Sequence, residues 1–314
     1  MSEIQSENPE VNNPQQENPE QNPAKQPSKA GLFFLQLFKA ACYAILFLGM
    51  QIIFSFILFF VILVIRYIQN PQKWSALSSA EMDLETQKIT GIISNPVIIL
   101  SSICVLLFLW LFFLIRKKNL LQEADAVRFR PAYIPSLIVI AIGLSFFINT
   151  VLCLLPEDWL KSYSEASATL VSDLSLTTLL STVLCAPLVE EFIFRGLILS
   201  RLKKAMPLWV AILISSFLFG LMHGQPLWIC YASVLGILLC IVKERTGSIW
   251  ASMLIHIFFN AYGVSISLLL KEYTQILFYS MLVIGALCIP LGYILLYKVK
   301  PKQTASPKNA AETD

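Results

Sequence analysis

The stretch from residue 174 to residue 200 reads LSLTTLLSTVLCAPLVEEFIFRGLILS and holds the densest group of charges in any apolar run of this chain. Glu190, Glu191 and Arg195 lie within six residues of one another. A charged side chain at the centre of a bilayer costs roughly 2.5–3.5 kcal/mol on insertion scales, so three of them need a compensating role. The run is also long enough to cross a bilayer, which takes about 20 residues. This stretch therefore predicts a membrane-spanning helix with a polar site inside it.

The composition of the whole chain also indicates a membrane protein. Hydrophobic residues make up 56% of the chain and charged residues 14%, and the mean hydropathy is +0.69. These values lie outside the usual balance of a soluble domain. The apolar runs predict an all-α, polytopic membrane fold with about eight transmembrane helices. The expected spans are residues 40–65, 97–115, 135–155, 174–200, 207–223, 226–242, 249–270 and 275–297.

The two ends of the chain differ from this apolar middle. The first thirty residues are rich in Asn, Gln, Glu and Pro, and such a segment has too little apolar surface to offset its ordering entropy. We therefore expect a disordered cytoplasmic tail at 1–30, one integral membrane domain at 31–300 and a second cytoplasmic tail at 301–314.

The distribution of basic residues predicts the orientation in the membrane. If the N-terminus lies in the cytoplasm, 17 of the 23 Lys and Arg residues fall on the cytoplasmic side, five fall on the other side, and Arg195 lies within a span. Cytoplasmic loops carry an excess of Lys and Arg, so both termini are expected to be cytoplasmic. Segments 67–95 and 156–173 then lie outside, and 116–134 lies inside. The net charge of +3 needs no nucleic-acid partner to explain it.

Helical spacing predicts different surroundings for the two adjacent glutamates. Glu191 and Arg195 are four residues apart with the acid first, the favoured order for a pair on one helix face. Glu190 is rotated by about 100° from Glu191. We expect Arg195 to neutralise Glu191 as a structural pair, which leaves Glu190 as a candidate general base.

The only two histidines of the chain lie in later spans. His223 shares a predicted helix face with Phe219, and His256 shares one with Asn260, because both pairs are spaced i, i+4. If these faces converge on Glu190, the site holds a base, two imidazoles and an amide that can donate to a developing oxyanion. That set suits attack of water on a peptide carbonyl. No serine or cysteine with an adjacent histidine offers a nucleophile instead.

Each of these features also has a structural interpretation. A lone histidine in an apolar helix is more often a hydrogen-bonded core residue, and Asn260 can join helices. Two other functional classes also fit buried charges: a non-catalytic membrane scaffold, and a proton-coupled transporter that uses Glu190 and the histidines as a relay. A transporter should show an internal repeat of short, broken helices, which the sequence lacks. The occurrence of both histidines with the buried glutamates favours an enzyme.

Three short motifs in this region resemble those of a known family. The CAAX-protease and bacteriocin-processing (CPBP, or Abi) intramembrane proteases carry similar motifs, and residues 245–250, RTGSIW, are also similar to that family. The resemblance covers roughly residues 174–262, the motif core of the membrane domain. The motifs are Glu190-Glu191-Phe192-Ile193-Phe194-Arg195-Gly196, Phe219-x-x-x-His223 and His256-x-x-x-Asn260.

The resemblance implies a CAAX-protease-like helical core and an endopeptidase, of glutamate or metallo type, with its active site below the bilayer surface. It implies that Glu190 is the catalytic base, that His223 activates the same water, and that His256 and Asn260 hold the oxyanion. Glu191, Arg195 and Phe219 are then supporting residues. The implied partners are the lipid bilayer and a membrane-associated protein or peptide, lipidated or not. We expect the plasma membrane of a bacterium, and a eukaryotic origin would place the protein in an internal membrane such as the endoplasmic reticulum. A bacteriocin-immunity protein of the same fold is the non-catalytic alternative.

A metal-dependent mechanism stays open at this point. Glu190, His223 and His256 can be written as a zinc set with an open fourth position, but they come from three spans and lack the His-Glu-x-x-His spacing of common zinc proteases. The seven cysteines are dispersed without a Cys-x-x-Cys pair, which argues against a thiolate site. The sequence therefore does not establish a cofactor. We favour the metal-independent mechanism, with zinc as the alternative.

Overall fold

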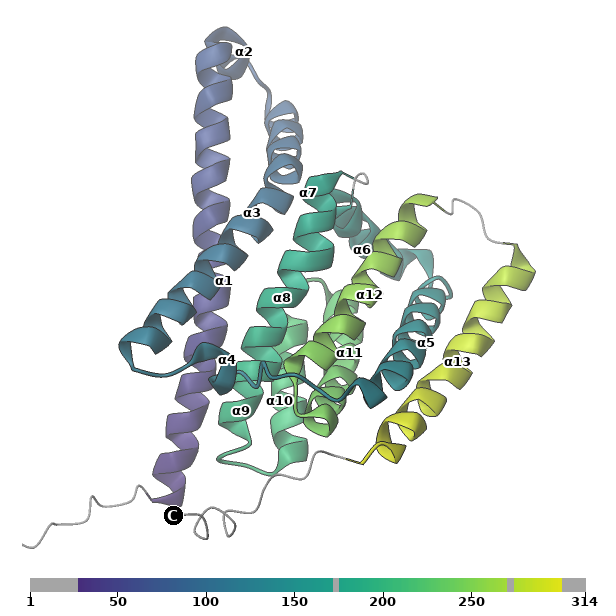
Figure 1. The fold of residues 1–314 in the computed structure, drawn as a ribbon. Coiled ribbons are helices and arrows are strands. Elements are labelled where there is room, and N and C mark those ends of the chain that lie inside the picture. Colours follow the sequence, from purple (N-terminus) through teal and green to yellow (C-terminus); the bar gives the residue numbers. More distant parts are fainter. Residues whose placement is uncertain (1–27, 172–174, 270–273, 301–314) are drawn as a thin grey trace, which may run out of the picture.

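The computed structural model describes residues 28–171, 175–269 and 274–300, and within these residues the chain is helical without a strand. The long helices alternate in direction through the bundle (Figure 1). In chain order the elements are α1 (Lys29–Gln69), α2 (Pro71–Ser75), α3 (Ser79–Ile115), α4 (Leu120–Glu123), η1 (Pro131–Tyr133), α5 (Ile134–Leu152), α6 (Glu157–Leu170), α7 (Leu176–Thr178), η2 (Leu179–Cys185), α8 (Ala186–Glu190), η3 (Glu191–Ile198), α9 (Leu199–Leu202), α10 (Leu208–Leu221), α11 (Pro226–Thr246), α12 (Ile249–Leu269) and α13 (Gln275–Lys298).

The prediction of an all-α polytopic membrane fold is confirmed. Among the described residues, six helices are long and apolar enough to cross a membrane, namely α1, α3, α5 with η1, α11, α12 and α13. The shorter apolar helix α10 is a seventh segment. The eighth is the run from α7 to α9, in which α-helical and π-helical turns follow one another. Every expected span therefore corresponds to a helical segment.

Several expected boundaries differ from the observed helix ends, and two of these differences have a clear local cause. The second span was expected at 97–115, but α3 begins at Ser79 because Ser78 and Glu81 form a reciprocal capping box. The fifth span was expected to run to residue 223, but α10 ends at Leu221. Gly224 follows with a φ of 74°, a left-handed conformation that glycine adopts without strain and that ends a helix.

The tail predictions lie almost entirely outside the described residues. Helix α1 already begins at Lys29, so the last two residues of the expected N-terminal tail are helical. Residues 1–27 and 301–314 are not among those that the structure describes, and both tails remain predictions.

The packing places the motif-bearing helices in the middle of the bundle (Figure 1). The α1–α3 hairpin covers one side, and the α5–α13 pair covers the other. Glycines allow this second pair to approach closely, since a Cβ at Gly292 would lie 2.5 Å from Ile140 Cγ1 and one at Gly285 would lie 2.6 Å from Phe147 N. Between the two pairs, every side chain from Glu191 to Leu202 is buried. The charged motif therefore lies at the centre of the molecule.

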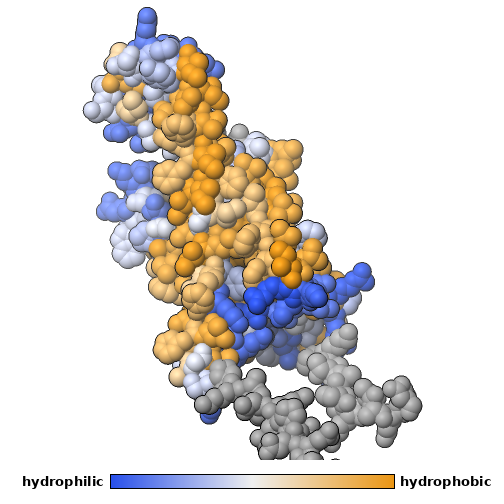
Figure 2. Space-filling model, turned by 90° about the vertical axis from the view of Figure 1, so that its left-hand side faces the viewer, coloured by the Kyte–Doolittle hydropathy of each residue, from blue (hydrophilic) through white to orange (hydrophobic). Residues whose placement is uncertain are grey.

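Charged side chains gather where α3, α9 and α11 end, on the side of the bundle where α1 begins and α13 ends, and we call this cluster the basic end (Figure 1). An apolar band covers the α1–α3 face above it (Figure 2). Two carboxylates of the α3–α5 connection hold the bundle there, because Asp125 Oδ2 lies 2.6 Å from Lys243 Nζ and Glu123 Oε2 lies 2.5 Å from Arg201 Nη2. The basic end comprises Arg116, Lys117, Lys118, Glu123, Asp125, Arg201, Lys203, Lys204, Lys243, Glu244 and Arg245.

Candidate active site

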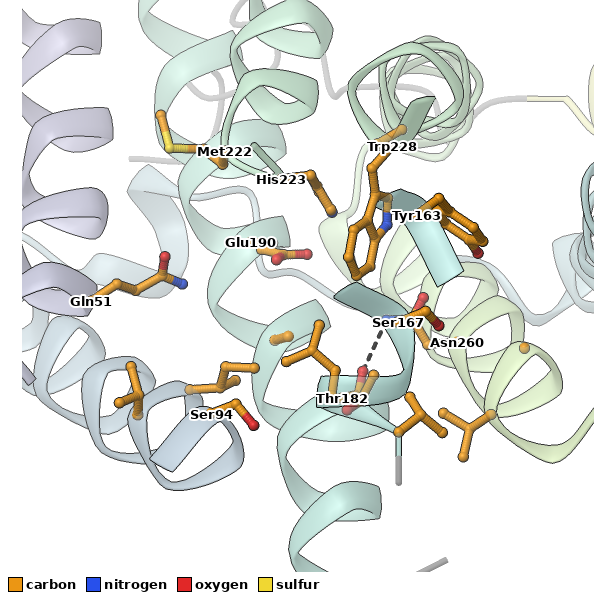
Figure 3. Close-up of a pocket in the computed structure, with 18 of the residues that line it drawn as sticks. Gln51, Ser94, Tyr163, Ser167, Thr182, Glu190, Met222, His223, Trp228 and Asn260 are labelled. Atoms are coloured by element: carbon orange, nitrogen blue, oxygen red, sulfur yellow. Dashed lines mark hydrogen bonds between the residues drawn. The ribbon is translucent and has the colours of Figure 1, made fainter. Parts of the chain in front are cut away.

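A cavity of about 1140 Å³ lies between the α1–α3 hairpin and the central helices. Its lining includes Phe219 and the four candidate catalytic residues Glu190, His223, His256 and Asn260. Figure 3 shows the Glu190 carboxylate and the His223 ring turned toward the same space, with the Trp228 ring beside them. The structure thus brings together, from three separate segments, the residues that the motifs single out.

Glu190 faces this cavity without a fixed partner. It makes no hydrogen bond to any described residue, and its side chain is 13% exposed. The nearest charged group is His256, whose Nε2 lies 3.7 Å from Glu190 Oε2, too far for a direct hydrogen bond. A carboxylate held in this way is free to bind a ligand or a water molecule.

Glu191 points to the other side of the helix, where it is completely buried and has three partners. Arg195 Nη1 lies 3.0 Å from Glu191 Oε1, the contact that the four-residue spacing predicts. His256 Nδ1 lies 3.0 Å from the same oxygen, and the Ser252 hydroxyl donates to Glu191 Oε2 at 2.7 Å. The spacing argument thus placed both glutamates on the correct faces, but it missed two of the three partners.

Arg195 is held as much by an aromatic ring as by its carboxylate. Its guanidinium carbon lies 4.1 Å from the centre of the Phe219 ring, a cation–π distance. Although the ion pair with Glu191 is close, none of the Arg195 nitrogens has a well-aligned hydrogen bond among the described residues. The Phe219 ring also meets both imidazoles edge-on, with centroids 5.0 Å from His223 and 5.7 Å from His256. Phe219 therefore separates the ion pair from the cavity and packs against both histidines.

His256 lies between the two glutamates. Because the Glu191 carboxylate accepts a hydrogen bond from His256 Nδ1, that nitrogen carries a proton. The other ring nitrogen, Nε2, faces Glu190. This placement adds a constraint to the oxyanion role implied by the family resemblance. An oxyanion donor at His256 requires a second proton, on Nε2.

His223 lies in the turn after α10, not on the helix face shared with Phe219. Its Nδ1 is 3.0 Å from the Phe219 carbonyl oxygen. Since a carbonyl can only accept, Nδ1 donates, and Nε2 of the neutral ring is left as an acceptor. The ring also lies 5.7 Å from that of Trp228. The backbone turn, and not helical periodicity, thus sets the orientation of this imidazole.

Asn260 is anchored by one of its two amide hydrogens. Its Nδ2 donates to the Thr182 carbonyl oxygen at 2.9 Å, the bond drawn in Figure 3. The second Nδ2 hydrogen is not used by a described residue. The amide can therefore still donate one hydrogen bond into the cavity.

Sequence reasoning missed several residues around the site. Ser252 had a signal, because it lies four residues before His256 on α12 and so shares its helix face. Tyr163 and Trp228, whose rings lie 5.7 Å apart at the cavity wall, had none. They come from α6 and α11, and only the tertiary packing brings them to the motif residues.

The zinc alternative finds no support in the side-chain arrangement. Among the residues that the structure describes, no group of three or more His, Cys, Asp and Glu side chains could hold a metal ion. Glu190, His223 and His256 therefore do not form a metal-ligand set in this arrangement.

Comparisons with known proteins show that the central segment is similar to a protease family. Residues 172–262 match the family described as type II CAAX prenyl endopeptidase Rce1-like. An Escherichia coli protein described as an uncharacterized 24.3 kDa protein is 28% identical over 162 residues, which cover 48% of this chain and 72% of that protein. A Bacillus subtilis (strain 168) protein named putative membrane peptidase YdiL is 27% identical over 105 residues, 33% of this chain and 43% of that protein. No solved structure matches the chain significantly.

The family match spans all three motifs, from before Glu190 to beyond Asn260. The resemblance to CAAX-type proteases is therefore confirmed for this segment. The chain is a multi-pass membrane protein whose residues 172–262 are similar to the Rce1-like family of CAAX prenyl endopeptidases. The matched part of the chain covers less than half of the Bacillus subtilis relative.

Proposed function

We propose that this chain is an intramembrane endopeptidase that cleaves a peptide bond with a water molecule activated by Glu190 and His223. One observation carries the proposal: a carboxylate that makes no hydrogen bond to a described residue lines one cavity inside the helical bundle together with two imidazoles. Such a set is suited to general acid–base catalysis. The match of residues 172–262 to a CAAX endopeptidase family supports the same reaction class.

In the proposed reaction, the Glu190 carboxylate removes a proton from water while the water oxygen attacks the carbonyl carbon of the substrate. The carbonyl π bond opens, and the negative charge moves to the former carbonyl oxygen. Glu190 then returns the proton to the amide nitrogen as the carbon–nitrogen bond breaks, which regenerates the carboxylate. His223 Nε2 orients the same water by accepting its other hydrogen, since Nδ1 is held by Phe219.

The tetrahedral oxyanion needs hydrogen-bond donors at the opposite wall. Asn260 supplies its second Nδ2 hydrogen, while the first stays on Thr182 and fixes the amide. His256 acts beside it when Nε2 is protonated. Glu191, Arg195 and Phe219 support the site by holding the two imidazole rings.

The proposed partners are the lipid bilayer and a membrane-associated protein or peptide, lipidated or not. CAAX-type or bacteriocin-related processing both fit this class. The plasma membrane of a bacterium is the proposed location, because both relatives described above come from bacteria. A non-catalytic scaffold or immunity protein is the alternative, and it predicts that Glu190 is dispensable.

Substrate trapping tests the proposed function directly. Membranes that carry the native chain should accumulate cleaved peptides that are missing when Glu190→Gln replaces it, and the uncleaved precursors should co-purify with the variant. Glu157→Gln is the matched control, because Glu157 is an exposed carboxylate in the first turn of α6. Identical peptide profiles for the native chain and Glu190→Gln would refute the protease and favour the scaffold.

We also propose that the basic end faces the cytoplasm, so that both termini lie inside. The proposal rests on the excess of Lys and Arg there. Single cysteines at Gln72, Lys118 and Ser164 should report it in a cysteine-free background, which is needed because native cysteines such as Cys42 and Cys153 are exposed. Lys118 should be labelled from the cytoplasm, and Gln72 and Ser164 from outside. Cytoplasmic labelling of Gln72 would reverse the orientation.

A further inference from the structure

The wall of the cavity formed by α1 and α3 carries polar side chains in otherwise apolar helices. Gln51 of α1 and Ser102 of α3 both line the cavity. Figure 3 shows Gln51 extending into it from the side opposite Trp228 and Asn260. The α1–α3 hairpin lies outside the segment that matches the protease family, so these two residues belong to none of the motifs described above.

Ser102 is a buried polar group that the fold leaves unsatisfied. The residue is 2% exposed, and its hydroxyl oxygen has no hydrogen-bond partner among the described residues. A buried polar atom left unpaired destabilises the fold. The adjacent Ser101 avoids this cost, because its hydroxyl donates to the Ile98 carbonyl oxygen at 3.3 Å. The contrast between two neighbouring serines marks Ser102 as a group that a ligand in the cavity can satisfy.

Gln51 is a second polar side chain at this wall, and its amide can make more hydrogen bonds than a hydroxyl. It is half-buried in an apolar span, and its amide makes no hydrogen bond to a described residue. A primary amide both donates and accepts, so it is complementary to a peptide group. An extended peptide offers an N–H and a C=O at each residue, and main-chain hydrogen bonds commonly hold such segments in their binding sites.

The electrostatics of the cavity limit the kind of segment that fits. Among the described residues that line it, Glu190 is the only Asp, Glu, Lys or Arg. No described cation is therefore placed to pair with a free C-terminal carboxylate of the substrate. With a volume of about 1140 Å³, the cavity exceeds the roughly 300–1,000 Å³ of common small-molecule pockets, so it has room for several residues of a peptide.

We propose, resting on the function proposed above, that Gln51 and Ser102 form a neutral subsite for the main chain of an uncharged, extended substrate segment. The peptide enters between the α1–α3 hairpin and the central helices, and these two side chains hydrogen-bond its backbone while Glu190 directs water to the scissile carbonyl. Binding and cleavage then do not depend on a free carboxylate at the end of the substrate. The site cleaves internal bonds of apolar segments.

Binding is tested with the full chain carrying Glu190→Gln, so that the probe stays intact. The probe is a fluorescent, farnesylated peptide of apolar residues in two forms, one with a C-terminal carboxylate and one with a carboxamide. In liposomes, the two forms should bind with dissociation constants within about twofold of each other. Adding Gln51→Leu or Ser102→Ala should weaken binding about two- to tenfold, since one neutral hydrogen bond contributes about 0.5–1.5 kcal/mol. Ser101→Ala, the matched control, should bind like the parent.

Cleavage of the same peptides by the native chain separates this proposal from the proposed function. Gln51→Leu and Ser102→Ala should raise KM with little change in kcat, whereas loss of cleavage in Glu190→Gln tests the protease alone. A carboxylate form that binds more than about tenfold tighter would overturn the neutral subsite, as would Ser102→Ala and Gln51→Leu variants that bind like the parent, or a parent that binds neither form. Variant-dependent binding without any cleavage would uphold the subsite and refute the protease.

Discussion

The charged groups at the basic end and those at the central site differ in how their carboxylates are paired. At the basic end, Lys243 lies between two carboxylates, with its Nζ 2.6 Å from Asp125 Oδ2 and 2.7 Å from Glu244 Oε1. There Glu244 also pairs with Lys203. At the centre, Glu191 has three partners while the adjacent Glu190 has no hydrogen bond to a described residue. At the basic end each of these carboxylates is paired with a Lys or Arg, whereas in the central site Glu190 makes no hydrogen bond to a described residue.

This difference distinguishes carboxylates that stabilise the fold from a carboxylate that is available for a reaction. A buried ion pair is retained when both partners are satisfied, and removing one partner leaves a costly unpaired charge. The carboxylates of the basic end and Glu191 follow this rule, and Arg195 is held by its ion pair with Glu191 and by the Phe219 ring. Packing does not explain Glu190, because a carboxylate without a hydrogen bond inside a helical bundle lowers the stability of the fold and makes no contact that offsets this cost. Such groups concentrate at functional sites.

The largest expected effect is that of Glu190→Gln on catalysis. The variant keeps the shape of the side chain but removes the base, so substrate cleavage should fall at least about a hundredfold, within the 10²–10⁴-fold typical of positioned acid–base groups. Membrane abundance should stay normal, because Glu190 makes no hydrogen bond to a described residue and its nearest charged group, His256 Nε2, is 3.7 Å away. His223→Ala should be similarly inactive, and combining the two should add little if both act on one water. Cleavage rates per folded molecule are the measurement.

A chelator experiment on the native chain sharpens the same prediction. Since Glu190, His223 and His256 do not form a metal-ligating group among the described residues, cleavage should persist in a strong chelator. Loss of activity that added zinc restores would establish a metal-dependent mechanism instead.

The next largest effect is on folding. Arg195→Ala should destabilise the protein by about 3–5 kcal/mol, because it leaves Glu191 as an uncompensated charge in a fully buried position. The abundance of folded protein in membranes should drop accordingly. Combining Glu191→Gln with Arg195→Gln should recover much of it, because the pair is removed together. Equal abundance of the single and double variants would show that the pair is not structural.

Asn260→Ala should have a smaller catalytic effect than Glu190→Gln. Loss of one oxyanion donor typically costs about 10²–10³ in kcat, and we expect the lower end because His256 remains beside it. The residual activity should be measurable in kcat, with KM nearly unchanged. An Asn260→Ala variant as inactive as Glu190→Gln would place the amide in a more direct role.

Lys243→Gln compares the two charge groups in one experiment. It should cost about 1–2 kcal/mol, less than Arg195→Ala, because Asp125 and Glu244 are partly exposed and water replaces the lost partner. Thermal unfolding in detergent measures the cost, and cleavage per folded molecule should not change. A catalytic defect in this variant would link the basic end to the active site.

The helical segments and the Glu191–Arg195 contact could be predicted from the sequence. The features that could not be predicted all depend on contacts between segments or on the backbone conformation. Hydropathy located all eight helical segments, and the i, i+4 spacing of Glu191 and Arg195 predicted their contact. Contacts between segments were beyond reach: nothing in the sequence pairs His256 with Glu191, which is 65 residues away. The turn that orients His223 depends on the backbone at Gly224. Ser102 looks like an ordinary serine in the sequence, and only the packing shows that its hydroxyl has no hydrogen-bond partner among the described residues.

The smallest expected effect concerns acid stability at the basic end. Burial raises the pKa of Glu123, but hydrogen bonds from Lys118 and Arg201 outweigh it and hold the pKa below the ordinary value of 4.5. A carboxylate with a lowered pKa contributes stability that is present above its unfolded pKa and is lost as the pH falls through the folded pKa. The native chain should therefore unfold at a higher temperature than Glu123→Gln at neutral pH, by an amount worth less than about 1 kcal/mol for a partly exposed pair. The difference should vanish well below pH 4.5. A difference that is the same at both pH values would show that the charge on Glu123 contributes nothing to holding the α3–α5 connection on α9, and that packing alone fixes this end of the bundle.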